Sequence, residues 1–286
     1  MLYILYRIGF FLARIMPLKA CYFAGSLVAW VYFLFAEKDK EILRENLRMV
    51  LGKNTDADTI DKHVLEVFKN FAKYLADFFR FPRVTEDYVF ENIEIEGREH
   101  MDACLAEGNG VILLSLHLGN WELGGAVVAA LKYPISAIVL KHANKRINDF
   151  FTRQRSINNL KAIPVGLQIK ECFRVLRKNE ALAIAGDKDY TSGGIYVDFF
   201  GRKAVMPKGP AVFSLKTSAP IVVCVLTRKK DDTFRFCFEE PIRYEPTGEY
   251  DKDVRALMEK YLAVFEKHIR ENPDQWYAFK KIWVQE

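Results

Sequence analysis

Apolar residues recur at helical spacing in the first third of the chain and in short runs after it. Between Glu41 and Leu51, and again between Thr59 and Arg80, they recur every three or four residues, which predicts two helices. Phe81-Pro82 ends the second helix, because the residue before a proline is pushed out of the α region. From Val89 onward, short apolar runs alternate with helical segments. We therefore expect an α/β fold with a mixed sheet flanked by helices.

The expected strands are short and rich in β-branched or apolar residues. They are Ile93 to Ile95, Val111 to Leu116, Ile135 to Leu140, Ala181 to Ala185, Ile195 to Phe199, Ile221 to Thr227 and Phe234 to Phe238. The helices expected among and after them are Arg98 to Glu107, Trp121 to Leu131, Lys145 to Asn158, Gln168 to Lys178, Gly209 to Thr217 and Asp251 to Glu271. The chain divides into residues 1–36, a helical region 37–88 that packs on the core, and an α/β domain 89–286.

Residues 1–36 are expected to form membrane-anchoring helices. The run from Ala20 to Ala36 is uncharged and apolar, near the lower length limit for spanning a bilayer. The preceding apolar segment carries Arg7 and Arg14, as an interfacial helix does when its arginines reach the headgroups. Whether this region spans the bilayer, lies on it or packs as a buried hairpin stays open. Basic residues between 38 and 48 keep the downstream domain cytoplasmic by the positive-inside rule.

Charge and cysteine content exclude several classes of protein. A formal charge of +5 over 286 residues does not predict nucleic-acid binding, although it suits a membrane surface or an anionic substrate. The five cysteines are scattered and form neither a Cys-x-x-Cys pair nor a cluster with histidine along the sequence. We therefore expect a reducing compartment and no metal site.

His117 and Glu122 are the candidate catalytic residues. His117 follows the buried strand pattern 111–116 and precedes a Gly119-Asn120 turn, so it lies at the carboxyl end of a strand, where open α/β sheets bind ligands. On one helix, side chains five residues apart diverge by about 140°. With the turn between them, Glu122 can instead fold back onto the imidazole, fix its tautomer and leave the other nitrogen as a general base.

The segment from His117 to Glu122 resembles the signature of the bacterial lipid A biosynthesis acyltransferases, within the His-x4-Asp/Glu lysophospholipid acyltransferase group. The resemblance extends over most of the chain. It implies a glycerolipid acyltransferase-like α/β domain on an N-terminal membrane helix. It also implies that His117 is the general base, that Glu122 orients it, and that Gly119 and Asn120 belong to the substrate-binding turn, with amides near Gly119 or Arg153 receiving the oxyanion.

Further segments match the family in order. Arg153-Gln-Arg155-Ser resembles its paired arginines, which implies a place near the thioester oxyanion or a substrate phosphate. Asp187-Lys188-Asp189 resembles an Asp-Gln-Asp block, which implies that both acids bind the acceptor sugar or brace basic residues. Lys188 replaces the usual glutamine. Near the C-terminus, the segment 273–277 resembles a Pro-Glu-Gln-Trp block.

The expected function is transfer of a fatty acyl chain from acyl carrier protein to a hydroxyl of a lipid A precursor or related glycolipid at the bacterial inner membrane. No bound cofactor is expected, because acyl-acyl carrier protein or acyl-CoA is a co-substrate. The expected partners are acyl carrier protein, the glycolipid acceptor and membrane lipids. Three alternatives stay open: another acceptor (a lysophospholipid, a phosphoinositol mannoside or an aminolipid), a non-catalytic membrane lipid-binding protein, and a thioesterase.

Overall fold

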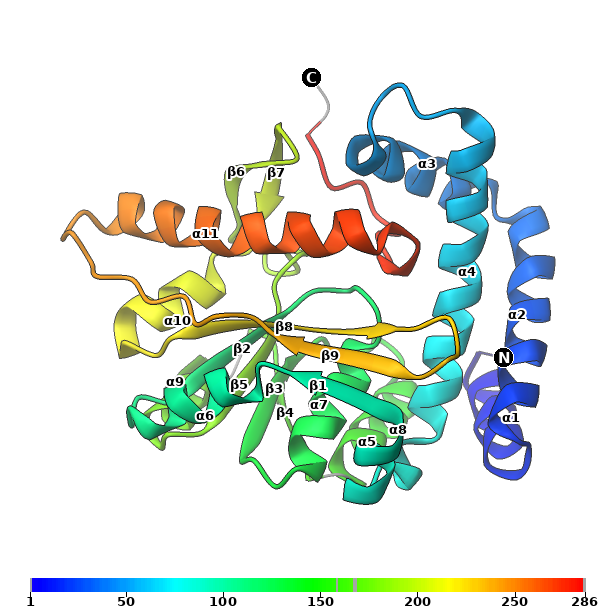
Figure 1. Ribbon diagram of the computed structural model, residues 1–286, viewed down its shortest axis with the longest axis horizontal. Helices are drawn as coiled ribbons and strands as arrows, with labels where there is room; N and C mark the ends of the chain where they lie inside the picture. The colour runs from blue at the N-terminus through cyan, green and yellow to red at the C-terminus, as the bar shows by residue number, and fades with distance from the viewer. Residues whose placement is uncertain (1, 158, 167–168, 285–286) are drawn as a thin grey trace.

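A seven-stranded mixed sheet forms the centre of the molecule, which a computed structural model describes for residues 2–157, 159–166 and 169–284 (Figure 1). Its strands lie in the order β1-β9-β8-β2-β5-β3-β4. They are β1 Ile93–Glu96, β2 Val111–Ser115, β3 Ile135–Val139, β4 Lys161–Pro164, β5 Ala181–Ala185, β8 Ile221–Arg228 and β9 Phe234–Phe238. Strands β8 and β9 pair antiparallel and every other neighbouring pair is parallel. The predicted mixed sheet is therefore confirmed.

Helices cover both faces of this sheet, so β2 is apolar throughout rather than alternating. They are α1 Leu2–Ile15, α2 Leu18–Phe35, α3 Glu37–Leu51, α4 Ala57–Phe79, α5 Glu86–Asn92, α6 Arg98–Ala106, α7 Trp121–Ala130, α8 Lys145–Ile157, α9 Ile169–Arg177, α10 Gly209–Thr217 and α11 Tyr250–Glu271, with 3₁₀ turns η1 Phe81–Arg83 and η2 Pro273–Gln275. Val111 and Leu113 pack in the core under α6, α7 and α8, and Ile112 and Leu114 pack in the opposite core under α9, α10 and α11.

Several boundaries differ from the sequence-based expectation. The predicted end of one helix at Asn158 and start of another at Gln168 lie outside the described residues. The expected strand at 195–199, β6 Ile195–Phe199, forms a separate antiparallel hairpin with β7 Arg202–Met206 instead of joining the main sheet. The two strands are joined by Phe200 and Gly201, both at positive φ, as a two-residue hairpin turn requires. The expected domain boundary between 88 and 89 falls inside α5.

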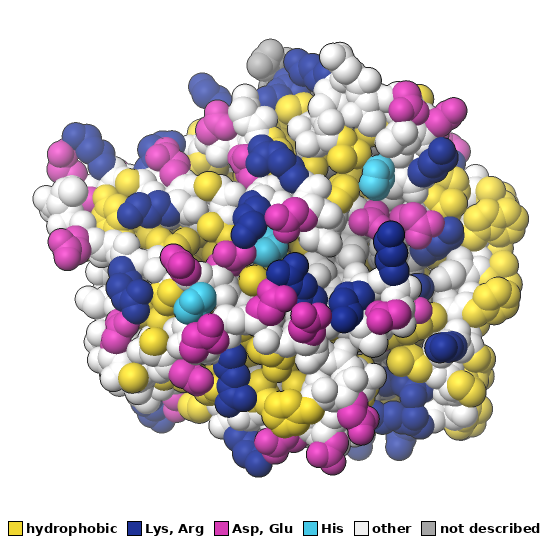
Figure 2. Space-filling view, in the orientation of Figure 1, with side chains coloured by type: hydrophobic (Ala, Val, Ile, Leu, Met, Phe, Trp, Pro, Cys, Tyr) yellow, Lys and Arg dark blue, Asp and Glu magenta, His cyan; other side chains and the backbone are white. Residues whose placement is uncertain are grey.

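The N-terminal helices lie on one flank of the molecule (Figure 1). Helix α2 packs along α4, which separates it from the sheet. Within the described part of the chain, α2 is the one helix long and apolar enough to cross a membrane. The outer faces of α1 and α2 expose large apolar side chains, among them Phe11, Phe23 and Phe35. Figure 2 shows hydrophobic side chains gathered along this flank.

Candidate functional site

Two adjacent parallel strands bring His117 and Asp187 together. The register of β2 and β5 pairs Ser115 with Ala185, and each functional residue follows two positions later at the carboxyl end of its strand. The Nδ1 atom of His117 lies 2.6 Å from Oδ1 of Asp187, and the His117 amide donates to the same oxygen at 3.1 Å. A carboxylate accepts at Nδ1, so that nitrogen carries the proton and Nε2 is left as the basic nitrogen.

Asp187 is almost completely buried, and its charge is nevertheless retained. Burial alone would raise the pKa of this carboxyl, but the contacts with His117 and the charge of Lys188 outweigh it and hold the pKa far below its usual range. The second carboxylate oxygen accepts from the indole nitrogen of Trp276 at 3.3 Å. Asp187 is therefore an ionised, fully partnered carboxylate that fixes the imidazole.

Glu122 occupies a different position from the one expected. Its carboxylate forms a bidentate ion pair with Arg155 of α8, in which Arg155 Nε donates to Oε2 at 2.9 Å and Nη2 donates to Oε1. Both side chains are largely buried. The structure thus places Asp187, and not Glu122, on the imidazole of His117. Glu122 lies in the first turn of α7, where its side chain points across the site toward Arg155 of α8 rather than back at the histidine.

The backbone amides of the Gly119-Asn120 turn bond to carbonyl groups of the protein. Gly119 adopts a φ of 62°, and a Cβ there would lie 2.0 Å from the Leu226 carbonyl oxygen, so only glycine fits. The Gly119 amide donates to the carbonyl of Gln275 at 2.9 Å, and the Asn120 amide donates to Leu226 at 2.8 Å. The expectation that amides near Gly119 receive the oxyanion is therefore corrected, because these amides are already bonded.

Asn120 is a buried capping residue rather than a cavity-lining one. Its Oδ1 accepts from the Leu123 amide at 3.1 Å at the start of α7, and its Nδ2 donates to Asp77 at 2.8 Å. The expected substrate contact by Asn120 is corrected accordingly, since both ends of its amide face protein partners.

Of two further expected site residues, Arg153 lies outside the cavity beside His117 and Asp189 lies in its lining. Arg153 is exposed on α8 and does not line this cavity, because side chains two residues apart on a helix point about 160° apart and Arg155 occupies the inner face. Asp189 lines the cavity, but its oxygens accept from the Thr191 and Gly194 amides at 2.8 Å each and hold the following loop.

Aromatic residues that sequence reasoning did not assign to the site surround the imidazole. The ring centroids of Trp121 and His117 lie 4.8 Å apart, and the ring of Tyr74 on α4 stacks on Trp121 with its centroid 4.5 Å away. The amide of Tyr277 donates to the His117 carbonyl at 2.8 Å. The resemblance of the 273–277 segment to a family block was the one signal for the C-terminal contribution, and nothing in the sequence marked Tyr74.

A cavity of about 730 Å³ opens beside His117. Its lining is mostly apolar and includes the glycines of α7 and side chains of β3, α9 and α10, with a smaller polar group at the histidine. The basic residues of its lining are Arg155, Lys188, Lys208 and Lys216, together with the histidines His117 and His142. Its volume lies within the range of about 300–1,000 Å³ typical of ligand sites. A long apolar group fits it, with the reacting end at His117 Nε2.

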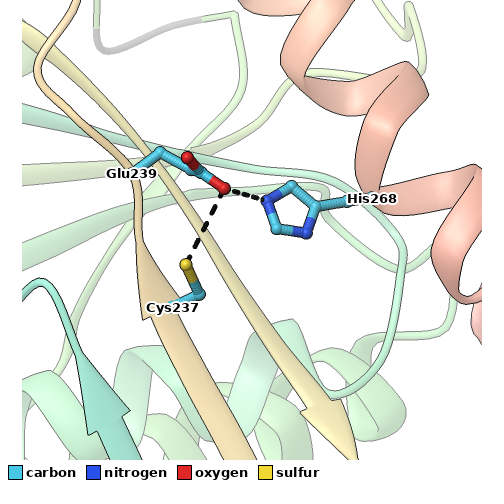
Figure 3. Close-up of side chains that lie close together, drawn as sticks. All are labelled: Cys237, Glu239 and His268. Atoms are coloured by element: carbon cyan, nitrogen blue, oxygen red, sulfur yellow. Dashed lines mark hydrogen bonds and ion pairs between the residues drawn. The ribbon is translucent and has the colours of Figure 1, made fainter.

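A second cluster of chemically capable groups lies away from this site (Figure 3). Cys237, Glu239 and His268 bring a sulfur, a carboxylate oxygen and an imidazole nitrogen within 4.8 Å of one another, a donor set that Zn²⁺ accepts. Glu239 Oε1, however, already accepts from His268 Nε2 at 2.7 Å and from Lys267 Nζ at 2.9 Å. The carboxylate charge is thus compensated by side chains, and the cluster ties β9 to α11.

Comparison with known proteins adds independent information. The family model of the bacterial lipid A biosynthesis acyltransferases matches residues 1–285. The phosphatidylinositol mannoside acyltransferase of Mycolicibacterium smegmatis is 24% identical over 283 residues, which cover 98% of this chain and 90% of that protein. The lipid A biosynthesis palmitoleoyltransferase of Escherichia coli is 25% identical over 272 residues, which cover 94% and 85%.

Among solved structures, the 1-acyl-sn-glycerophosphate acyltransferase PlsC of Thermotoga maritima aligns over 86% of this chain and 98% of its own. The TM-score of 0.38 and the identity of 10% are too low to support any conclusion.

The matches to the family model and to the relatives define the class of this protein, an O-acyltransferase. The chain belongs to the family of bacterial lipid A biosynthesis acyltransferases.

Proposed function

We propose that this enzyme transfers a fatty acyl chain from the thioester of acyl carrier protein to a hydroxyl of a lipid A precursor or related glycolipid, with His117 as the general base. The observation that carries the proposal is the buried Asp187 on His117 Nδ1, beside an apolar cavity of about 730 Å³. That arrangement supplies a base, a group that stabilises its protonated form, and space for an acyl chain.

The chemical step needs no side-chain nucleophile. His117 Nε2 removes the proton of the acceptor hydroxyl as its oxygen attacks the thioester carbonyl carbon, and Asp187 stabilises the resulting imidazolium. The carbon–sulfur bond then breaks, and the imidazolium returns the proton to the departing thiolate. The positive end of the α7 dipole supports the developing negative charge, since Trp121 and Glu122 of its first turn line the same cavity.

We propose a supporting role for Glu122 and Arg155. Their buried ion pair lines the cavity and joins α7 to α8, so it fixes the wall next to the base. Because Glu122 neutralises Arg155, the pair presents little net charge to an apolar chain.

The acceptor class rests on the names of the relatives. The relatives of Escherichia coli, Shigella flexneri and Haemophilus influenzae are named as lipid A biosynthesis enzymes, and those of Mycolicibacterium smegmatis and Mycobacterium tuberculosis are phosphatidylinositol mannoside acyltransferases. A phosphoinositol mannoside is therefore the second candidate acceptor. Both candidates are anionic glycolipids with a free hydroxyl, which suits a chain of net charge +5.

The proposed location is the bacterial inner membrane, with the catalytic domain facing the cytoplasm. The apolar outer faces of α1 and α2 support contact with lipid. Acyl carrier protein thioesters are cytoplasmic substrates, so the cavity must open on that side.

A defined transfer assay tests the proposal. Purified enzyme is incubated in micelles with acyl-acyl carrier protein or acyl-CoA, each with a lipid A precursor or a phosphoinositol mannoside, and the lipids are analysed by mass spectrometry. The proposal predicts an acceptor heavier by one acyl chain. Release of free fatty acid with every acceptor left unchanged would contradict it and indicate a thioesterase.

A further inference from the structure

A buried carboxylate outside the catalytic pair joins three elements of the fold. Asp77 of α4 is 5% exposed. Its Oδ1 accepts from the Tyr22 hydroxyl of α2, and its Oδ2 accepts from Asn120 Nδ2 at 2.8 Å and from the Arg228 guanidinium at the end of β8. One side chain therefore connects the N-terminal helix pair, the sheet and the Gly119-Asn120 turn after His117, which is called the catalytic turn below.

At one end, the contact reaches the turn that carries the base. Asn120 lies three residues after His117, and its side chain is held at both ends, by Asp77 and by the Leu123 amide of α7. Arg228 holds the same turn by a second route. Its backbone exchanges hydrogen bonds with the Gln275 side chain at 2.8 and 2.9 Å, and the Gln275 carbonyl accepts from the Gly119 amide.

At the other end, the contact reaches α2. Tyr22 is buried, whereas its neighbour Phe23 is 74% exposed on the outer face of the same helix. The Arg228 guanidinium also lies over the Tyr22 ring, 4.5 Å from its centroid. The position of α2 on α4 thus determines where the Tyr22 hydroxyl meets Asp77.

We infer that Asp77 is a positioning residue that couples the seating of α2 on α4 to the placement of His117, an inference that rests on the proposed role of His117 as the base. A movement of Tyr22 changes the bond that Asp77 makes to Asn120, and Asn120 is part of the turn that follows His117. Small displacements matter at such a site, since a misplacement of about 1 Å lowers turnover by about a hundredfold.

The energetics favour this role over a purely stabilising one. A buried ion pair contributes little net stability compared with apolar side chains of the same shape, because desolvation of both charges offsets their attraction. Its directional hydrogen bonds do specify positions. Asp77 also bonds the side chain that caps α7, at the point where the helix leaves the catalytic turn.

Two tyrosines of the same helix provide a matched test. Tyr22→Phe removes only the hydroxyl that donates to Asp77. Tyr32→Phe removes the hydroxyl that donates to Asp39 at 2.9 Å on the exposed side of α2, so it is the control. We expect Tyr22→Phe to lower kcat about three- to tenfold, the size of one hydrogen bond, with the KM for the acyl donor within about twofold of wild type. Tyr32→Phe should change neither.

Asn120→Ser removes the hydrogen bond from Asn120 to Asp77, and it tests the same inference if Tyr22→Phe fails to fold. Serine still caps a helix but cannot donate to Asp77 over the same reach. The same kcat loss at unchanged donor KM is expected. If both effects pass through Asp77, the double variant loses about as much as the worse single variant, whereas independent effects would multiply.

A readout that needs no turnover separates this inference from the proposed function. In protein labelled with ¹⁵N-histidine, the His117 imidazole signal is identified by its loss in His117→Ala, and it should shift in Tyr22→Phe and Asn120→Ser but not in Tyr32→Phe. A wild-type enzyme without transfer activity would refute the proposed function alone. Wild-type kcat together with an unshifted His117 signal in either folded network variant would overturn the coupling.

Discussion

His117 acquires its partner through strand register. Ser115 and Ala185 face each other on β2 and β5, so the residues two positions later, His117 and Asp187, emerge side by side at the carboxyl edge. The sequence predicts each of them at a strand end, and it marks Asp187 as a site residue. It cannot predict that they pair, because β2 and β5 become neighbours only when β3 and β4 are displaced to the edge of the sheet.

Replacing Asp187 by asparagine tests the role of its charge. Asp187→Asn should lower kcat at least about a hundredfold, because the imidazolium loses its ionised partner. The folded-state pKa of Asp187 is depressed, so its ionisation stabilises the fold above the ordinary aspartate pKa of about 3.9 and loses that effect as pH falls further. Denaturant unfolding across pH 3–7 should show the stability difference between the two proteins shrinking below about pH 4; a pH-independent difference would contradict this assignment.

Gly119 offers a second test at this scale, with Gly201 as its control. Both residues have positive φ, 62° and 73°, but only Gly119 has backbone within reach of an added Cβ, at 2.0 Å. Gly119→Ala should therefore reduce both stability and kcat, and Gly201→Ala should cost only the strain of its φ, about 1 kcal/mol. Thermal unfolding and the transfer assay measure both effects. Equal losses in the two variants would show that the close approach at Leu226 is unimportant.

Elements whose apolar pattern is long or strongly periodic were predictable, and short edge elements were not. The strands in the middle of the sheet and the helices α7, α10 and α11 lie close to their predicted bounds. Strand β4 has four residues and ends in a proline, which is tolerated only at an edge, and β7 pairs with one neighbour in a hairpin. Neither has enough apolar residues in succession to show a period.

Helix α7 supplies a wall of the cavity through Gly124, Gly125 and Val128. A Cβ on Gly125 would lie 3.2 Å from Leu160, so a valine there narrows the cavity. Gly125→Val should shift donor preference toward shorter acyl chains, with about a tenfold loss for the longest substrate and little for the shortest. Ala130→Val on the same helix, outside the cavity lining, is the control. Competition between acyl donors of different length measures the shift, and an unchanged preference would place the acyl chain elsewhere.

At the scale of the whole molecule, the N-terminal helices present an apolar surface, and α4 lies between them and the sheet (Figure 1). Val28 and Phe35 of α2 are 68% and 80% exposed, which is typical of a surface that contacts lipid. Sequence composition predicted the apolar character of this region. It could not predict how α2 packs on α4, because that depends on side chains more than 40 residues apart in the chain, such as Tyr22 and Asp77.

Membrane attachment through this surface is tested by vesicle flotation. Val28→Asp and Phe35→Asp should each weaken binding to phospholipid vesicles at least about tenfold, since a carboxylate is strongly disfavoured in the apolar layer. Tyr250→Asp replaces an exposed aromatic residue away from α2, at the start of α11, and should bind as wild type does. Equal binding of all three variants would show that α2 is not the attachment surface.

The central claim is that His117 is the base for acyl transfer, and the most direct measurement compares His117→Ala with His63→Ala, a half-buried histidine on α4 away from the cavity. Both proteins should fold, as judged by circular dichroism. Mass spectrometry of the acceptor after a defined incubation with acyl donor should then show the acylated product with wild type and His63→Ala. We expect His117→Ala to form it at least about a hundredfold more slowly. Acylated product at the wild-type rate in His117→Ala would contradict the account.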